Sequence, residues 1–134
     1  MTRDVDAIDV NMGCPKRFSV HAGMGAALLS KPETAEDIIK TLKRNLPIPV
    51  SAKIRLLATT EETVEFSRRM EHSGLDALVV HARTLQHQST DPANWELLRP
   101  VVDALSIPVI VNGDVYSQDD IEQCKALSGC SSVM

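Results

Sequence analysis

The sequence contains few aromatic side chains and no long apolar run. Phenylalanine, tryptophan and tyrosine make up 3% of its 134 residues, so a platform on which nucleotide bases could stack is hard to build from them. No apolar run approaches the roughly 18 residues that a membrane-spanning helix needs, and no segment resembling a signal peptide follows Met1. We therefore expect no membrane partner. The aromatic residues are Phe18, Phe66, Trp95 and Tyr116.

Cysteine and net positive charge are scarce as well. The three cysteines are an odd number at irregular spacing, which favours reduced thiols in an intracellular compartment over a disulfide framework. No spacing of cysteine and histidine matches a zinc site, so we expect no metal. The formal net charge of −4 argues against tight binding of nucleic acid by this chain alone. The expected location is cytoplasmic or nuclear.

The composition is globular, with 43% apolar and 24% charged residues on a length that suits one domain. Five short apolar runs are rich in β-branched residues and are bounded mostly by proline, glycine or asparagine, which is typical of buried strands. Helical patterns separate them, and two of these begin with the spacing of a capping box. The runs are 7–12, 49–54, 76–81, 107–112 and 131–134, and the capping residues are Thr59, Glu62, Ser117 and Asp120.

Strands and helices alternate, and successive strands begin about 31 residues apart, as they do in a (β/α)8 barrel of about 250 residues. We therefore predict an α/β fold, a partial (β/α)8 TIM barrel with between four and five of the eight units. The alternative is an open doubly wound sheet, which is usually marked by a glycine-rich turn directly after its first strand. The pair Gly23-x-Gly25 does not directly follow a strand, which favours the barrel.

Four of the five expected strands end in polar residues, although parallel strands that are buried on both faces are usually apolar throughout. The active site of a barrel enzyme is built at the carboxyl ends of its strands. The shared polar bias therefore predicts a site at this rim. Its residues are Asn11 and Cys14, Lys53 and Arg55, His81 and Arg83, and Asn112, Gly113 and Asp114.

Alternation along the second strand places Lys53 and Arg55 opposite its apolar residues, and hence inside the barrel. A lysine in that position is costly unless it has a partner. An anion or an electron-rich ring would serve, and so would a salt bridge to Asp9 or Asp114. The residues alone leave both interpretations open.

Cys14 and His81 each have a structural interpretation beside a catalytic one. Free cysteine is often a small buried residue, but a Gly-Cys-Pro turn holds Cys14 at the rim, where a protonated thiol can donate a proton. A lone histidine at the end of an apolar strand is more often structural, and an expected position beside Lys53 favours a role in the site. The turn at 112–114 has the glycine and backbone N–H groups that phosphate sites use.

Together these motifs resemble the tRNA-dihydrouridine synthase family, and within it the eukaryotic tRNA-dihydrouridine(20) synthases. The similarity runs in order along essentially the whole chain, and its NMGCPK segment is highly specific. The motifs are Asn11 to Lys16 (NMGCPK), Gly23 to Leu29 (GMGAALL), Lys53-Ile54-Arg55, His81-x-Arg83 and Asn112-Gly113-Asp114.

The resemblance implies an FMN-binding barrel followed by a helical domain that binds tRNA. In this family NADPH (or NADH) reduces the flavin, the reduced flavin gives a hydride to C6 of a flipped-out uridine, and a cysteine protonates C5. Carried over to this sequence, the resemblance makes Cys14 the general acid. It also implies that Lys53 and His81 contact the flavin ring, that Asn112, Gly113 and Asp114 line its phosphate side, and that Asn11, Arg55 and Arg83 hold the substrate.

The resemblance further implies that residues 1–134 cover strands 4 to 8 of the barrel, as the C-terminal part of the catalytic domain. The N-terminal strands and the tRNA-binding domain would lie outside it, so we expect little or no activity from this segment alone. The alternative is an incompetent fragment or isoform that acts only through association with another chain, such as the missing half of the barrel. A flavin barrel acting on a free pyrimidine is a further alternative, against which the NMGCPK segment argues.

Overall fold

The computed structural model describes residues 5–134 and contains one parallel sheet of five strands. Each strand pairs with the next one in the sequence, so the order is β1-β2-β3-β4-β5. A doubly wound sheet would reverse this order at a switch point, which rules out that alternative. The strands are β1 (Ile8–Asn11), β2 (Val50–Leu56), β3 (Ala77–Thr84), β4 (Val109–Asn112) and β5 (Ser132–Val133).

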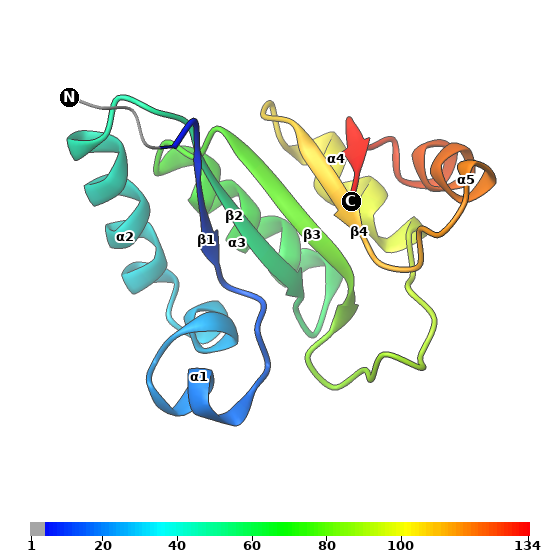
Figure 1. The fold of residues 1–134 in the computed structure, drawn as a ribbon, viewed down its shortest axis with the longest axis horizontal. Helices are drawn as coiled ribbons and strands as arrows, with labels where there is room; N and C mark the ends of the chain where they lie inside the picture. Colours follow the sequence, from blue (N-terminus) through cyan, green and yellow to red (C-terminus); the bar gives the residue numbers. More distant parts are fainter. Residues whose placement is uncertain (1–4) are drawn as a thin grey trace.

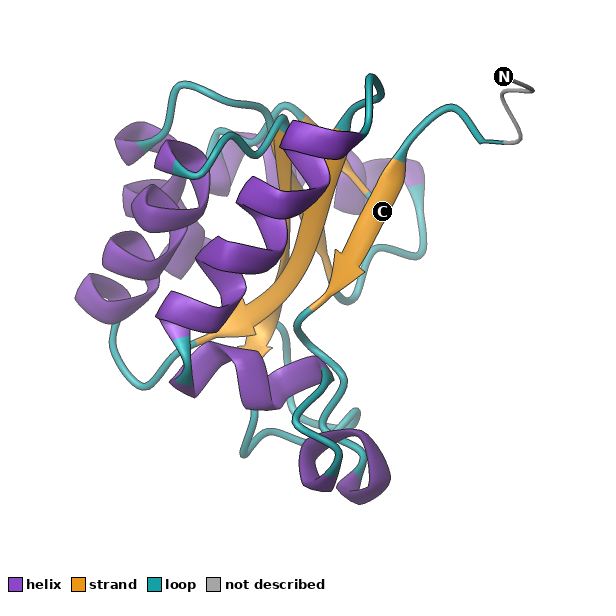
Figure 2. Ribbon diagram, turned by 90° about the vertical axis from the view of Figure 1, so that its left-hand side faces the viewer, coloured by secondary structure: helices purple, strands orange, loops and turns teal. Residues whose placement is uncertain are grey.

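The helices that connect these strands cover one face of the sheet. In Figure 1 the strands lie in front of the middle helices, so the reader looks onto the uncovered face. Figure 2 shows the same arrangement from the side, with the long helices next to one another along the sheet. They are α2 (Pro32–Asn45), α3 (Thr60–His72), the pair η2 (Glu96–Leu98) and α4 (Arg99–Ala104), and α5 (Gln118–Ser128).

Burial along β2 separates the two faces. Val50, Ala52 and Ile54 are fully buried under the helices. Lys53 and Arg55, which alternate with them along the strand, are only half-buried. Because side chains alternate along a strand, the polar residues point to the face that the helices leave bare. That face is the interior of a barrel, as the sequence predicts.

Both predicted capping boxes are present. The hydroxyl of Thr59 accepts the backbone N–H of Glu62 at 3.1 Å, and the carboxylate of Glu62 accepts the N–H of Thr59 at 3.2 Å. Ser117 and Asp120 make the same reciprocal pair at the start of α5. A cap of this kind contributes about 1 kcal/mol to helix stability, which fixes where α3 and α5 leave the rim of the sheet.

The connection from β1 to α2 contains more structure than the sequence predicts. It folds into α1 (Arg17–His21) and the 3-10 helix η1 (Gly25–Ser30), where a loop is expected from the sequence. Figure 1 shows α1 beyond the carboxyl end of β1, away from the long helices. Each piece is one or two turns long, too short to show a periodic apolar pattern. This connection places a small projecting element directly beside the predicted site.

Candidate functional site

The polar side chains at the carboxyl ends of β1 to β4 lie around one cavity of about 320 Å³. Six of the nine residues predicted for the site line it, while Arg83, Gly113 and Asp114 are not part of its wall. The strand ends with polar residues therefore bring most of these side chains to one cavity. The cavity is lined by Asn11, Gly13, Cys14, Pro15, Lys53, Ile54, Arg55, His81 and Asn112.

Asn11 shapes the turn that presents Cys14. Its side-chain Oδ1 accepts hydrogen bonds from the backbone N–H groups of Gly13 and Cys14, both at 3.1 Å. On the other side the carbonyl of Cys14 accepts the N–H of Ala26 at 3.0 Å. Gly25, with φ +57°, packs so closely that a Cβ there would lie 2.8 Å from the same carbonyl oxygen. The cysteine backbone is thus fixed from two directions, and the oxygen of Asn11 is already engaged.

The thiol of Cys14 is a stronger acid than an ordinary cysteine. A hydrogen bond from the backbone N–H of Lys16 lowers its pKa most, followed by one from the hydroxyl of Ser19, whose Oγ lies 3.6 Å from Sγ. The charges of Lys16 and Arg55 lower the pKa further. All of these interactions stabilise the thiolate that remains after the proton has left. The surroundings of Cys14 therefore suit a group that donates a proton.

We expect Ser19→Ala to raise the pKa of the Cys14 thiol, because the substitution removes a hydrogen-bond donor to the sulfur. The pH midpoint for alkylation of the thiol by iodoacetamide should move upward. Cys124 and Cys130 are buried, so the reaction reports Cys14. The control is Ser30→Ala, because that hydroxyl donates to the carbonyl of Ala27 and not to the sulfur. Equal midpoints for the two variants would contradict the assignment.

Lys53 and Arg55 bring two positive charges to the open face, and within residues 5–134 neither forms a salt bridge. Nζ of Lys53 donates to Oδ1 of Asn112 at 2.8 Å, and Nη1 of Arg55 donates to the carbonyl of Thr84 at 2.9 Å. Partial burial, together with a neighbouring cation, lowers the pKa of both groups. Such a site attracts an anion or an electron-rich ring, because either would offset the cost of holding the charges there.

The alternative in which a salt bridge neutralises Lys53 is wrong. Asp9 accepts a hydrogen bond from the hydroxyl of Ser51 at 2.7 Å. Asp114 is paired with Arg83, whose Nη2 lies 2.6 Å from its Oδ1. The neutral amide of Asn112 takes the place of the expected carboxylate, so the positive charge of Lys53 remains available.

His81 lies two residue pairs further along the sheet than a position opposite Lys53. The register sets Lys53 opposite Val79, and Arg55 opposite His81. The expected position directly beside Lys53 is therefore wrong, because a small shift of register between strands cannot be read from the ends of apolar runs. On its other side His81 is level with Asn112, so the histidine still faces the cavity.

The imidazole of His81 is neutral, and one of its tautomers is selected. Burial and then the charges of Arg55 and Lys53 lower its pKa to about 4. Nη1 of Arg83 lies 3.1 Å from Nε2 of the ring. Because a guanidinium group can only donate, Nε2 accepts and the ring proton is on Nδ1. Against the same edge of the ring packs Gly113, with φ +114°, where a Cβ would lie 2.9 Å from Cδ2.

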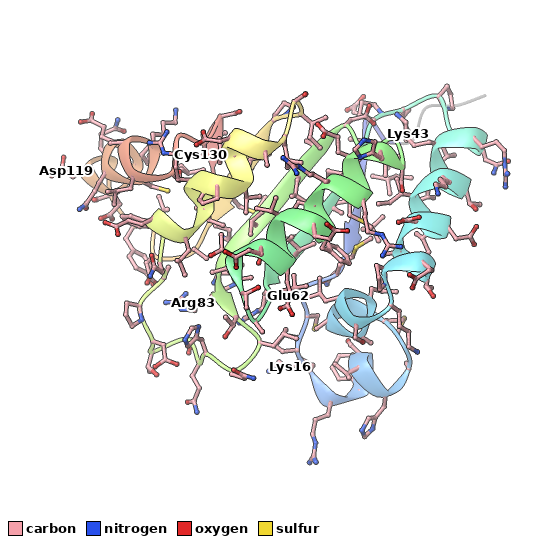
Figure 3. The ribbon with its side chains drawn as sticks, turned by 180° about the vertical axis from the view of Figure 1, so that it is seen from behind. Lys16, Lys43, Glu62, Arg83, Asp119 and Cys130 are labelled. Atoms are coloured by element: carbon pink, nitrogen blue, oxygen red, sulfur yellow. The ribbon has the colours of Figure 1, made fainter. Side chains whose placement is uncertain are left out.

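Arg83 is 5% exposed, and protein atoms occupy its donors. Nε donates to the carbonyl of Asp91 at 2.5 Å, and Nη2 donates to the carbonyl of Ser89 at 3.3 Å and to Asp114 at 2.6 Å. The other oxygen of Asp114 accepts the N–H of Ala93 at 2.7 Å. Figure 3 shows Arg83 at the end of the sheet where this connection lies. The pair ties the connection after β3 to the end of β4.

Two residues that support the site are not predicted from the sequence. Ser19 hydrogen-bonds to the thiol of Cys14, and Trp95 donates from Nε1 to the carbonyl of Gly113 at 2.9 Å. Ser19 carries no signal in the sequence, because it lies in a segment that has no recognisable period. Trp95 begins a series of apolar residues at helical spacing, which continues with Leu98, Val101 and Val102. That spacing accounts for its packing but not for the polar contact.

Within residues 5–134 no group of three histidine, cysteine, aspartate or glutamate side chains is placed where it could hold a metal ion. In the same residues, every helix is too short or too polar to cross a membrane.

Comparison with known proteins finds one family model, described as dihydrouridine synthase, that matches residues 1–134. A tRNA-dihydrouridine(16) synthase of Ralstonia nicotianae is 39% identical over 95% of this chain and 40% of its own length. A protein of the same name from Neisseria meningitidis is 43% identical over 96% of this chain and 40% of its own. The tRNA-dihydrouridine(20) synthase [NAD(P)+] of Schizosaccharomyces pombe is 40% identical over 90% of this chain and 26% of its own.

The chain therefore spans about two fifths or less of these relatives, and proteins named for two different tRNA positions match it at similar identity. Among solved structures, N-acetylneuraminate lyase of Mycoplasma synoviae matches with a TM-score of 0.69 and 16% identity, over 98% of this chain and 43% of its own. Dihydrodipicolinate synthase of Agrobacterium tumefaciens matches with a TM-score of 0.66 and 17% identity, over 97% and 42%. These matches concern the fold alone, and they confirm the predicted partial (β/α)8 barrel.

Proposed function

The chain belongs to the dihydrouridine synthase family, and from that premise we propose that it takes part in the reduction of uridine to 5,6-dihydrouridine in tRNA, with FMN as its flavin and NADPH or NADH as the reductant. The observation that carries this proposal is the position of an acidified thiol next to a cationic face that lacks carboxylate partners. Cys14, Lys53 and Arg55 supply these two features.

The residues present fit a flavin. Lys53 and Arg55 are partly buried cations with no salt bridge in the described part of the chain, and a flavin carries both an electron-rich ring and a phosphate. Lys53 and the neutral His81 would contact the ring system. Asn112 and the backbone of Gly113 and Asp114 would face the phosphate, because the carboxylate of Asp114 is already used by Arg83. When bound and reduced, the flavin would supply a hydride to C6 of the uracil ring.

Cys14 would complete the reaction by donating its thiol proton to C5. The residues around it favour this step, because the N–H of Lys16 and the hydroxyl of Ser19 stabilise the thiolate that forms. The remaining amide donor of Asn11 and the guanidinium of Arg55 would hold the polar edge of the uracil. Arg83 would act on the substrate only indirectly, by fixing the tautomer of His81.

We further propose that this chain is the C-terminal part of the FMN-binding barrel, covering about strands 4 to 8. Within residues 5–134, β1 and β5 each pair with a single strand, and the uncovered face carries the proposed site. A closed barrel would cover both edges and would add flavin contacts from the other strands. The helical tRNA-binding domain of the family would supply further contacts with the tRNA.

The test is titration of the purified chain with FMN, followed by flavin fluorescence. We expect Lys53→Met to weaken FMN binding by about 10- to 100-fold, because one charge-assisted hydrogen bond is worth roughly 1.5–3 kcal/mol. The control is Lys125→Met, which removes an exposed lysine from α5. A wild-type chain that binds no FMN, or equal affinities for the two variants, would contradict the assignment of the flavin to these residues.

A further inference from the structure

One stretch of this acidic chain carries no acidic residue. From position 10 to position 32 there is neither aspartate nor glutamate, while Lys16, Arg17 and Lys31 fall within it, in a chain whose net charge is −4. All three side chains are exposed. None of them forms a salt bridge within residues 5–134, where the ion pairs are made by other cations. The cations at the start of this stretch belong to the element that projects beside the site.

The same element exposes large apolar side chains. Phe18 is 72% exposed, Met24 is 54% exposed and Val20 is 38% exposed, all within seven positions. Large apolar side chains that are exposed together on one short element can mark a surface that binds something. We name residues 16–24 the basic rim, because they combine these apolar side chains with the exposed cations Lys16 and Arg17.

The low aromatic content predicts that stacking on nucleotide bases is hard to achieve, but Phe18 is available for it. Aromatic residues are few, and two of them, Phe18 and Tyr116, are exposed at the rim, Tyr116 to 86%. Their surroundings differ in charge. Tyr116 donates to Asp114 and has Asp119 and Asp120 close by in the sequence, whereas Phe18 lies in the acid-free stretch. Among the aromatic residues that the structure describes, Phe18 alone combines an exposed ring with surroundings that lack acidic side chains in the sequence and can attract phosphate.

The basic rim is continuous with the proposed site. The backbone N–H and the charge of Lys16 both act on the thiol of Cys14, and Met24 lines a second cavity together with Cys14 and Ser19. Figure 3 places Lys16 at the same end of the molecule as Arg83, away from Lys43 at the other end. A ligand that reaches Cys14 would therefore extend over this element.

The acidic group facing the rim from α3 is Glu62, which lines an apolar cavity together with Val20. Its carboxylate accepts the backbone N–H of Thr59 in the capping box, at 3.2 Å. The charge of Glu62 is thus turned to the start of α3, and Lys16 and Arg17 keep the rim positive.

We propose that the basic rim binds single-stranded RNA directly next to the nucleotide whose base enters the site. Lys16 and Arg17 contact phosphates, and Phe18 stacks on a neighbouring base. Enzymes that act on a base must take it out of its stack, which leaves the adjoining bases without a neighbour on one side. An exposed aromatic ring replaces part of that lost stacking, and flanking cations track the backbone. This inference rests on the proposed function, since it takes RNA as the substrate.

The test measures binding of a labelled oligouridylate of about 12 nucleotides to the whole chain by fluorescence anisotropy, without flavin or nicotinamide, between about 50 and 200 mM salt. We expect the wild-type dissociation constant to lie near about 10⁻⁴ to 10⁻⁶ M. Lys16→Ala with Arg17→Ala should lower the slope of log affinity against log salt by about 1.4, because each phosphate contact on a single strand contributes about 0.7. Phe18→Ala should weaken binding about 5- to 100-fold and leave the slope unchanged, because stacking involves no counterion.

Arg44→Ala and Tyr116→Ala are the matched controls. Arg44 is exposed in the last turn of α2, next in the chain to Lys43, which Figure 3 shows at the end of the molecule away from Lys16. Tyr116 is the other exposed aromatic residue. Both should bind as the wild type does. The proposal is overturned if the wild type does not bind the oligouridylate at about 50 mM salt, or if the controls lose as much affinity as the rim variants. These outcomes leave the proposed function intact, because FMN titration and dihydrouridine formation decide it separately.

Discussion

Replacing Cys14 by alanine should lower the rate of dihydrouridine formation by about 10²- to 10⁴-fold, because the reaction then loses the group that protonates C5. The side chain lines the cavity, and the turn around it depends on backbone contacts and on the amide of Asn11 rather than on the sulfur. The alanine variant should therefore keep its fold and its affinity for FMN. The rate would be measured by incubating initially unmodified tRNA with the protein and following dihydrouridine by mass spectrometry. Both the variant and the wild type would be assayed in the assembly in which the wild-type chain is active.

The pH profile separates proton donation from a packing role of Cys14. A general acid must be protonated, so the wild-type rate should fall as the pH rises through the pKa of the thiol. Because the surroundings of Cys14 lower that pKa, this fall should begin below the pH typical of a free cysteine. The alanine variant should have lost this limb of the profile. Cys124→Ala, at a buried thiol whose pKa burial raises to about 11, is the control and should keep it. A Cys14→Ala variant that retained the wild-type rate and profile would remove this residue from the mechanism.

Arg83→Met should destabilise the fold by about 3 kcal/mol, because breaking a buried ion pair from one side leaves the other charge without its partner. The substitution removes the donors that hold Asp114 and the carbonyls of Asp91 and Ser89. It also frees Nε2 of His81, so the ring can take either tautomer. Urea unfolding would show a lower midpoint at an unchanged slope.

Arg69→Met is the matched control for Arg83→Met. Arg69 pairs with two carboxylates, Glu33 and Glu36, but its side chain is 32% exposed against 6% for Arg83. Exposed ion pairs contribute about 1 kcal/mol or less, so the control should lose little. If Arg83 acts through Asp114, then adding Asp114→Asn to Arg83→Met should recover part of the lost stability. Equal losses in the free energy of unfolding for Arg83→Met and Arg69→Met would contradict the prediction that the buried ion pair contributes more to stability than the exposed one.

The sequence predicts the barrel because three local signals agree along the chain. Short β-branched runs, helical periods and the capping residues Thr59 and Ser117 all reflect forces that act within one element. The elements in the connection after β1 are missed because α1 and η1 are each held by a few contacts, such as the N–H of Ala26 on the carbonyl of Cys14. Contacts between distant residues, rather than a repeating pattern, define such short pieces.

The site is predictable as a set of residues but not as a set of partners. Strand ends bring Cys14, Lys53 and His81 to one rim, because parallel strands all finish on the same side. Which polar group meets which depends on register and on rotamers. The partner of Lys53 is Asn112 rather than an aspartate. Arg83 is buried by the connection after β3, whose Asp91 carbonyl, eight residues further along the chain, accepts its Nε–H. Neither fact has a counterpart in composition or spacing.

The sequential order of the strands has a consequence for how this chain reaches its fold. Within residues 5–134 each strand after β1 pairs with the one that precedes it, and paired residues are at most as far apart in the chain as Ile8 and Val50. Among β1 to β5 no strand must therefore wait for a distant segment, so these strands can join the sheet one unit at a time as the polypeptide leaves the ribosome. A pause in translation after any of these β-α-β units would leave a paired sheet whose most recently added strand has an open edge, ready to accept the next strand.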